Sequence, residues 1–251
     1  MPVINEILER SVQGKTEPFL CGADDGRRYY VKGRNATQRG LCAEFVAGTL
    51  GREYFGLPVP EFQLLEVPKE LIQYSNVPDV RNLDVGMVFG SCIVKDVMEF
   101  GPTHRDRVSP ELAAKILLFD LWIRNDDRKM SGDGGNSNLL WQPEGKKLWV
   151  FDHNLAFDNT VLDINLLGQH AFGTLDSARK FLSDPVFRAE AEQQMAAGLA
   201  ALPDLLKRIP PEWYYLDAEQ TIGVDLRLDE VRQILERPLV ARDTFWRGLA
   251  I

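Results

Sequence analysis

Three oxygen-bearing side chains in the middle of the chain suit a metal-assisted transfer of a phosphoryl group. Asp127 follows a strongly apolar run, Asn138 stands shortly after it, and Asp152 comes directly after a second apolar run. Phosphoryl transfer requires a carboxylate that orients the attacking hydroxyl and hard oxygen ligands that hold magnesium on the phosphates. An aspartate, an asparagine and a second aspartate can meet both requirements.

A helix and a hairpin are expected to position these groups. Residues 109–111, Ser-Pro-Glu, form a helix start: the hydroxyl can cap the first turn, proline suits the first helical position, and an acid suits the N-terminal dipole. Apolar residues continue to about Ile123, which predicts a buried helix that ends just before Asp127. Residues 141–148 then predict a hairpin that joins two short strands, the second of which leads to Asp152.

A second pair of residues is expected on a hairpin and a helix near the N-terminus. An Asp-Gly turn between two apolar runs predicts a β-hairpin over residues 18–32, so that Lys32 ends a strand. Residues 39–51 predict a helix, with Glu44 on its second turn and Gly51 at its end. A strand lysine that contacts the nucleotide phosphates, held in place by a helix glutamate, is typical of kinases.

The loop motifs of this chain resemble those of known kinases. They are Asn-Asp-Asp-Arg at 125–128, Asn-Ser-Asn at 136–138 and Phe-Asp-His at 151–153. This set is similar to the atypical kinases of the HipA-like and phosphoinositide-kinase-like group, and it most resembles a compact bacterial HipA-like kinase domain. The resemblance implies an ATP- and magnesium-dependent kinase that phosphorylates a serine or threonine hydroxyl on a protein.

The resemblance also implies a role for each candidate residue. Asp127 is expected to be the catalytic aspartate, and Asn138 and Asp152 are expected to be the metal ligands. Lys32 is expected to contact the phosphates of ATP, and Glu44 to hold Lys32 in place.

Two choices within the loop stay open. Asp126 competes with Asp127 for the catalytic position, and Asn136 competes with Asn138 for the ligand position. We prefer the later residue of each pair, because an arginine follows Asp127 and two leucines follow Asn138.

Two further segments are expected to contact the nucleotide. Gly14 lies where kinases carry a glycine-rich cover over the phosphates, although segment 11–16 holds only this one glycine. Its Gly-Lys-Thr triplet is not a Walker A loop, because the position five residues before Gly14 holds glutamate in place of glycine. The connector residues Val97, Met98 and Glu99 are expected to hold adenine through their backbone.

The expected fold class is α+β. The resemblance implies a two-lobed, protein-kinase-like fold, with a small lobe of strands and a helix over residues 1–97 and a mainly helical lobe over residues 98–251. Beyond residue 157 the chain turns mainly helical, with apolar residues recurring every four positions from Phe187 to Leu199. The two lobes would form one catalytic unit.

Composition and charge disfavour several classes of protein. The chain has 29 basic and 37 acidic residues, a net charge of −8, which argues against sequence-independent binding of nucleic acid. Basic and acidic residues balance across residues 95–131, so charge does not favour a membrane surface as substrate. No apolar run approaches the roughly 20 residues that cross a bilayer, and the N-terminus lacks the pattern of a signal peptide. The three cysteines have no metal-ligand spacing, which favours a reduced, cytoplasmic chain.

The sequence leaves the acceptor and the partner undetermined. The resemblance implies a protein substrate and an antitoxin or other regulatory partner; nucleic acid and membrane are not expected partners. One alternative is a nucleotide-binding pseudokinase, which the single glycine in segment 11–16 and the long spacer after Arg128 favour. The other is a kinase of a small molecule or a lipid.

Overall fold

The computed structural model describes residues 1–251 except 12–15, 34–35, 131–135, 218 and 250–251. The chain forms two compact units. The first contains Met1–Phe45, Pro60–Lys95 and Ile209–Asp225, and the second contains Val46–Val59, Asp96–Arg208 and Leu226–Ile251. The expected boundary between two catalytic lobes at residue 97 stays a prediction, because a division into compact units does not define the lobes of a catalytic unit.

The first unit is built on a five-stranded antiparallel sheet with the strand order β1-β2-β3-β5-β4. Strands β2 and β3 form the predicted hairpin, and Gly26 in its turn has a φ of +77°, which glycine adopts without steric cost. Strand β5 pairs with both β3 and β4, and an isolated parallel bridge between Val3 and Glu66 joins the segment before β1 to β4. The elements are β1 (Ile4–Arg10), β2 (Phe19–Ala23), β3 (Arg28–Lys32), β4 (Phe62–Val67), α2 (Lys69–Tyr74), β5 (Gly86–Cys92) and the short 3-10 helices Val80–Asn82 and Pro211–Tyr214.

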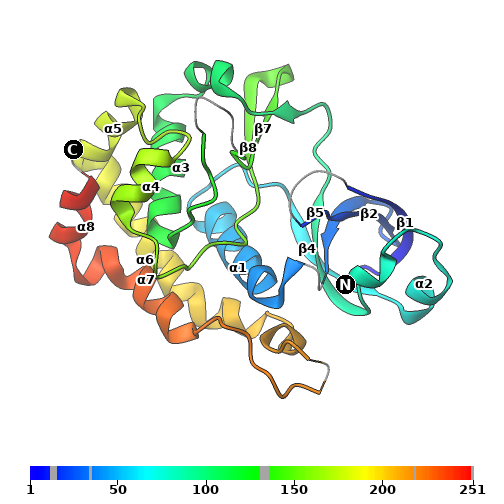
Figure 1. Ribbon diagram of the computed structural model, residues 1–251. Helices are drawn as coiled ribbons and strands as arrows, with labels where there is room; N and C mark the ends of the chain where they lie inside the picture. The colour runs from blue at the N-terminus through cyan, green and yellow to red at the C-terminus, as the bar shows by residue number, and fades with distance from the viewer. Residues whose placement is uncertain (12–15, 34–35, 131–135, 218, 250–251) are drawn as a thin grey trace. The chain divides into compact units, whose positions relative to one another are not determined.

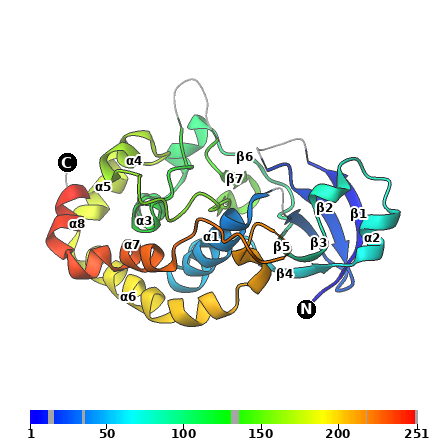
Figure 2. The same ribbon diagram turned by 60° about the horizontal axis from the view of Figure 1, so that its bottom comes forward.

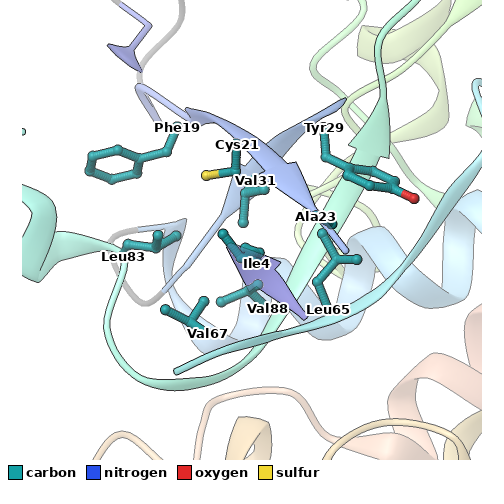
Figure 3. Close-up of a cluster of buried hydrophobic side chains, with 10 residues drawn as sticks. All are labelled: Ile4, Phe19, Cys21, Ala23, Tyr29, Val31, Leu65, Val67, Leu83 and Val88. Carbon is teal, nitrogen blue, oxygen red and sulfur yellow. The ribbon is translucent and has the colours of Figure 1, made fainter. Parts of the chain in front are cut away.

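Alternating side chains of this sheet form the core of the first unit. On β3, Tyr29 and Val31 are fully buried, whereas Tyr30 between them is 43% exposed, as the two-residue period of a strand requires. Figure 3 shows ten buried side chains of this core, which come from strands β1 to β5 and from the loop before β5. They are Ile4, Phe19, Cys21, Ala23, Tyr29, Val31, Leu65, Val67, Leu83 and Val88.

The second unit is mainly helical. Helix α7 packs against both α3 and α6, and Figure 2 shows the long helix α6 running beside α7. A small antiparallel sheet has the order β6-β7-β8. The elements are β6 (Met98–Glu99), α3 (Pro110–Ile123), β7 (Leu139–Gln142), β8 (Lys147–Val150), α4 (Asp163–Gln169), α5 (Asp176–Ser183), α6 (Pro185–Lys207), α7 (Leu228–Val240), α8 (Arg242–Leu249) and the short 3-10 helices Pro102–Arg107 and Glu144–Lys146.

The expected α+β class is confirmed, with an antiparallel sheet toward the N-terminus and helices toward the C-terminus (Figure 1). The predicted helix over 39–51 differs in its end. Helix α1 (Gln38–Thr49) continues as a π-helix, Leu50–Tyr54, and Gly51 lies within it. A Cβ atom at Gly51 would lie 3.2 Å from Cζ of Phe119, so close packing on α3 accounts for glycine there better than helix termination.

Cys21, Cys42 and Cys92 are all free thiols. Among the residues that the structure describes, no helix combines the length and the apolar character needed to span a membrane.

Candidate active site

Helix α3 delivers the chain to the loop that carries Asp127. The side chain of Ser109 accepts a hydrogen bond of 3.2 Å from the N–H of Leu112, which confirms the predicted cap. The helix ends at Ile123, and the φ of +50° at the following residue, Arg124, turns the chain out of the helical path. Because every residue from Ile116 to Ile123 is buried, the loop begins from a rigid support.

The structure brings Asp127 and Asn138 together. The side-chain amide nitrogen of Asn138 donates hydrogen bonds to Oδ2 of Asp127 at 2.9 Å and to its backbone carbonyl at 3.0 Å. Asp127 is partly buried, and within the described residues its Oδ1 accepts no hydrogen bond. One carboxylate oxygen is therefore anchored, and the other can receive a proton.

The other polar atom of the Asn138 side chain, Oδ1, is buried. Asn138 is 2% exposed, and its Oδ1 is buried without a hydrogen bond in the described part of the chain. Because the amide nitrogen is committed to the Asp127 carboxylate, Oδ1 must point away from it. A buried acceptor without a donor is costly, and coordination of a cation would satisfy it. The donor set thus fits magnesium.

Asp152 lies at the end of the same small sheet. Strand β8 ends at Val150, and the N–H of Phe151 donates to the carbonyl of Asn138 at 3.2 Å, which places Asp152 one residue beyond this link. Asn138 has a φ of +49° and Asp152 a φ of +57°. Such values are uncommon for residues other than glycine and recur at functional sites.

No group of three or more histidine, cysteine, aspartate or glutamate residues suited to a metal occurs among the described residues. Magnesium does not require one, because it is commonly bound through one or two carboxylates together with substrate phosphates and water.

The competing loop residues occupy different environments. Asp126 forms an ion pair with Lys129, with 2.9 Å between the charged atoms and both side chains substantially solvated. Asn136 is exposed, and its Oδ1 accepts a 3.2 Å hydrogen bond from the N–H of Asn138. Neither side chain takes part in the contact between Asp127 and Asn138. The assignment of Asp127 as base and Asn138 as ligand stays a prediction.

A buried arginine connects this loop to both strands of the hairpin. Arg128 is 1% exposed. Its guanidinium donates to the carbonyl oxygens of Asn138 at 2.6 Å and Phe151 at 3.2 Å. On its other side it donates to the carboxylate of Asp120 at 2.6 Å and 3.3 Å.

Asp120 is the centre of this buried network. His170 and Asn125 each lie 2.9 Å from one of its carboxylate oxygens. Complete burial opposes ionisation of Asp120, but the charge of Arg128 and the hydrogen bond from His170 outweigh it and hold the pKa well below its usual range.

His170 donates to Asp120 as a neutral ring. Its Nδ1 accepts a 3.0 Å hydrogen bond from the N–H of Phe172, so the proton lies on Nε2, which faces Asp120. Burial lowers the pKa of His170, and the carboxylate of Asp120 only partly opposes this. His170 fits no ligand spacing in the sequence. The sequence signal for this network was Asp120, because an acid inside an apolar helix needs a cationic or hydrogen-bonding partner.

In the first unit, the structure brings Lys32 and Glu44 together. Nζ of Lys32 lies 3.1 Å from Oε2 of Glu44, and the two side chains are 12% and 6% exposed. Lys32 ends strand β3 and Glu44 lies in α1, as the sequence predicted. A pair this well buried holds the ammonium group in one position more firmly than a surface pair would.

Four further residues were expected to contact the nucleotide: Val97, Met98, Glu99 and Gly14. Met98 and Glu99 form β6 and pair with Trp141 and Leu140 of β7, and Val97 directly precedes them. Gly14 lies outside the described residues. The proposed adenine and phosphate contacts of these four residues stay predictions.

Comparison with known proteins adds the following. The family model described as HipA-like kinase matches residues 4–249. One similar solved structure is the crystal structure of a Helicobacter pylori proinflammatory kinase, CtkA, with 12% sequence identity and a TM-score of 0.49; the match covers 99% of this chain and 96% of that one. No curated protein matches the sequence.

Proposed function

Because this chain belongs to the HipA-like kinase family, we propose that it is an ATP- and magnesium-dependent phosphotransferase that phosphorylates a serine or threonine hydroxyl on a protein. The observation that carries this proposal is the buried Oδ1 of Asn138, which accepts no hydrogen bond from the described residues, although the amide nitrogen is fixed by Asp127. This arrangement presents a ligand oxygen beside a carboxylate that can accept a proton.

Each residue of the site has a distinct task in this proposal. Asp127 would orient the acceptor hydroxyl and take its proton on Oδ1 as the phosphoryl group is transferred. Asn138 and Asp152 would hold the metal ion, which when bound neutralises the charge of the phosphates. Lys32, fixed by Glu44, would contact the phosphates of ATP.

The cellular setting belongs to the same proposal. We place the chain in the cytoplasm, with a protein substrate and an antitoxin or other regulatory partner. The net charge of −8 supports an acceptor other than nucleic acid.

The experiment is ATP turnover with magnesium by the full chain and by Asp152→Asn, followed by mass spectrometry of the protein and of a cell lysate treated with each. New phosphosites on serine or threonine that only the wild type produces would support the proposal. Parallel reactions with lipid vesicles and with small metabolites test the other acceptors. Nucleotide binding without transfer to any acceptor would instead indicate a binding module. If the chain neither binds nucleotide nor transfers phosphate, both the kinase and the binding-module hypotheses are refuted.

A further inference from the structure

Arg128 is not expected to touch metal or substrate, yet it contacts the backbone beside both candidate metal ligands. We propose that Arg128 is a positioning residue that holds Asn138 and Asp152 in the left-handed backbone conformations needed for metal binding. This inference rests on the proposed function, since it explains how the same site keeps its geometry.

The contacts of Arg128 coincide with the two unusual backbone positions. Its NH1 group donates to the carbonyl of Asn138 at 2.6 Å and to the carbonyl of Phe151 at 3.2 Å. The first carbonyl belongs to the peptide that follows Asn138, and the second to the peptide that precedes Asp152. Both residues have positive φ, 49° and 57°. One guanidinium nitrogen therefore fixes a peptide plane next to each of them.

The orientation of the guanidinium is itself fixed from the opposite side. Nε and NH2 of Arg128 both donate to Asp120, whose side chain, like that of Arg128, is 0% exposed. Asp120 is held in turn by His170, and the carbonyl of Arg128 accepts a 2.9 Å hydrogen bond from the N–H of Ala171. Because guanidinium is planar, anchoring one edge to Asp120 aims NH1 at these two carbonyls and, at 3.5 Å, at the carbonyl of Ser137.

Stability alone does not account for this arrangement. A fully buried ion pair contributes little net stability, because the cost of removing two charges from water offsets their attraction. A conformation that is uncommon for residues other than glycine persists only where its surroundings hold it. The pair of Arg128 and Asp120 provides such surroundings for Asn138 and Asp152, whose side-chain oxygen atoms would have to converge on one cation.

The test compares Arg128→Lys with Arg237→Lys in the full chain. Lysine keeps the charge, but its three donors all lie on one nitrogen, so it cannot keep the two-point contact with Asp120 and also reach the carbonyls that NH1 contacts. Arg237 is a matched control, because it too is largely buried and donates to a carboxylate, that of Asp163, and to backbone carbonyls, those of Leu121 and Trp122. Mn²⁺ with a non-hydrolysable ATP analogue is the probe, and electron paramagnetic resonance measures the unbound metal.

We expect Arg128→Lys to raise the dissociation constant for Mn²⁺ by about 10- to 100-fold, as the loss of groups that orient metal ligands typically does. The magnesium concentration for half-maximal turnover should rise by a similar factor. Arg237→Lys should lower the melting temperature of the ligand-free protein yet leave the Mn²⁺ dissociation constant at the wild-type value.

Equal Mn²⁺ affinity in Arg128→Lys and wild type would overturn the inference, and so would an equal loss in both arginine variants. If Arg128→Lys does not fold, Arg128→Gln replaces it, because its shorter amide cannot span from Asp120 to the two carbonyls; unchanged Mn²⁺ affinity in that variant would also overturn the inference. Absence of Mn²⁺–nucleotide binding in the wild type would refute the proposed function itself, which separates the two failures.

Discussion

The side-chain nitrogen of Asn138 donates a 2.9 Å hydrogen bond to Oδ2 of Asp127. This bond gives both side chains a defined orientation: it anchors one oxygen of the carboxylate and turns the amide oxygen of Asn138 away from it. The candidate base and a candidate metal ligand are therefore positioned by the same contact. The chemically identical Asp126 and Asn136 make neither contact: Asp126 pairs with Lys129, and the side chain of Asn136 accepts from the backbone N–H of Asn138.

The first prediction concerns the choice of base. Asp127→Asn should lower kcat by roughly 10²- to 10⁴-fold, the usual contribution of a general base, because an amide cannot take the proton of the acceptor hydroxyl. Asp126→Asn removes the same charge from the neighbouring, solvated position and should change kcat by less than about twofold. Steady-state phosphorylation assays compare them. A larger loss in the Asp126 variant would reverse the assignment.

The second prediction concerns the metal ligand in the loop. Asn138→Ala removes both the ligand oxygen and the hydrogen bond to Asp127, so we expect a rise of at least about tenfold in the magnesium concentration for half-maximal turnover. Asn136→Ala is the control, because that exposed side chain only accepts a hydrogen bond from the backbone of Asn138. Magnesium titrations of the initial rate provide the measurement. Similar curves for wild type and Asn138→Ala would exclude Asn138 as a ligand.

The third prediction concerns the buried ion pair of the first unit. Lys32→Met and Glu44→Gln should each raise the KM for ATP, and the double variant should be no worse than Lys32→Met, because Glu44 acts through Lys32. Thermal unfolding of the same set gives a coupling free energy, which we expect to be roughly 0.5–3 kcal/mol for residues in direct contact. Additive effects of the two substitutions on the KM would show that Glu44 does not act by holding Lys32.

The fourth prediction concerns stability against pH. Burial lowers the pKa of His170 below its ordinary value of 6.5, so the unfolded chain takes up this proton at a higher pH than the folded chain does. Stability from neutral His170 is therefore complete above about pH 6.5 and decreases as the pH falls through and below that value. The neighbouring charges are Asp120, Arg128 and Arg105.

His170→Gln keeps an N–H donor for Asp120 but cannot titrate. The variant should lose the decrease in melting temperature between about pH 7 and pH 5 that His170 causes in the wild type. The lowered pKa of Asp120 acts in the same direction but at more acidic pH, below about 4, so it does not obscure this window. Parallel slopes of melting temperature against pH in the two proteins would contradict the prediction.

Several features follow from local sequence alone. The Asp-Gly turn of the first hairpin, the Ser109 cap of α3 and the strands on either side of residues 141–148 were predicted where the structure has them. These features depend on the backbone preferences of a few adjacent residues and on the two-residue or 3.6-residue period of apolar side chains. The order of Lys32, Glu44, Asp127, Asn138 and Asp152 along the chain was also sufficient to indicate the family.

Other features were decided only by tertiary structure. Strand β1 was not expected, because its mixed residues become a strand only by pairing with β2. Trp213 belongs to the first unit, where its indole donates to the carbonyl of Met87 on β5 and its own carbonyl accepts from Cys42, although 126 residues separate it from Met87.

The candidate site shows the same division. The sequence supplied the types of residue, but it could not distinguish Asp127 from Asp126 by chemistry, nor pair Asp120 with Arg128 and His170. Those relationships join residues that are eight and fifty positions apart through buried hydrogen bonds. Long-range partners of this kind depend on how the helices, hairpin and loops pack together, because a buried polar group must be satisfied by whatever groups the fold brings near it.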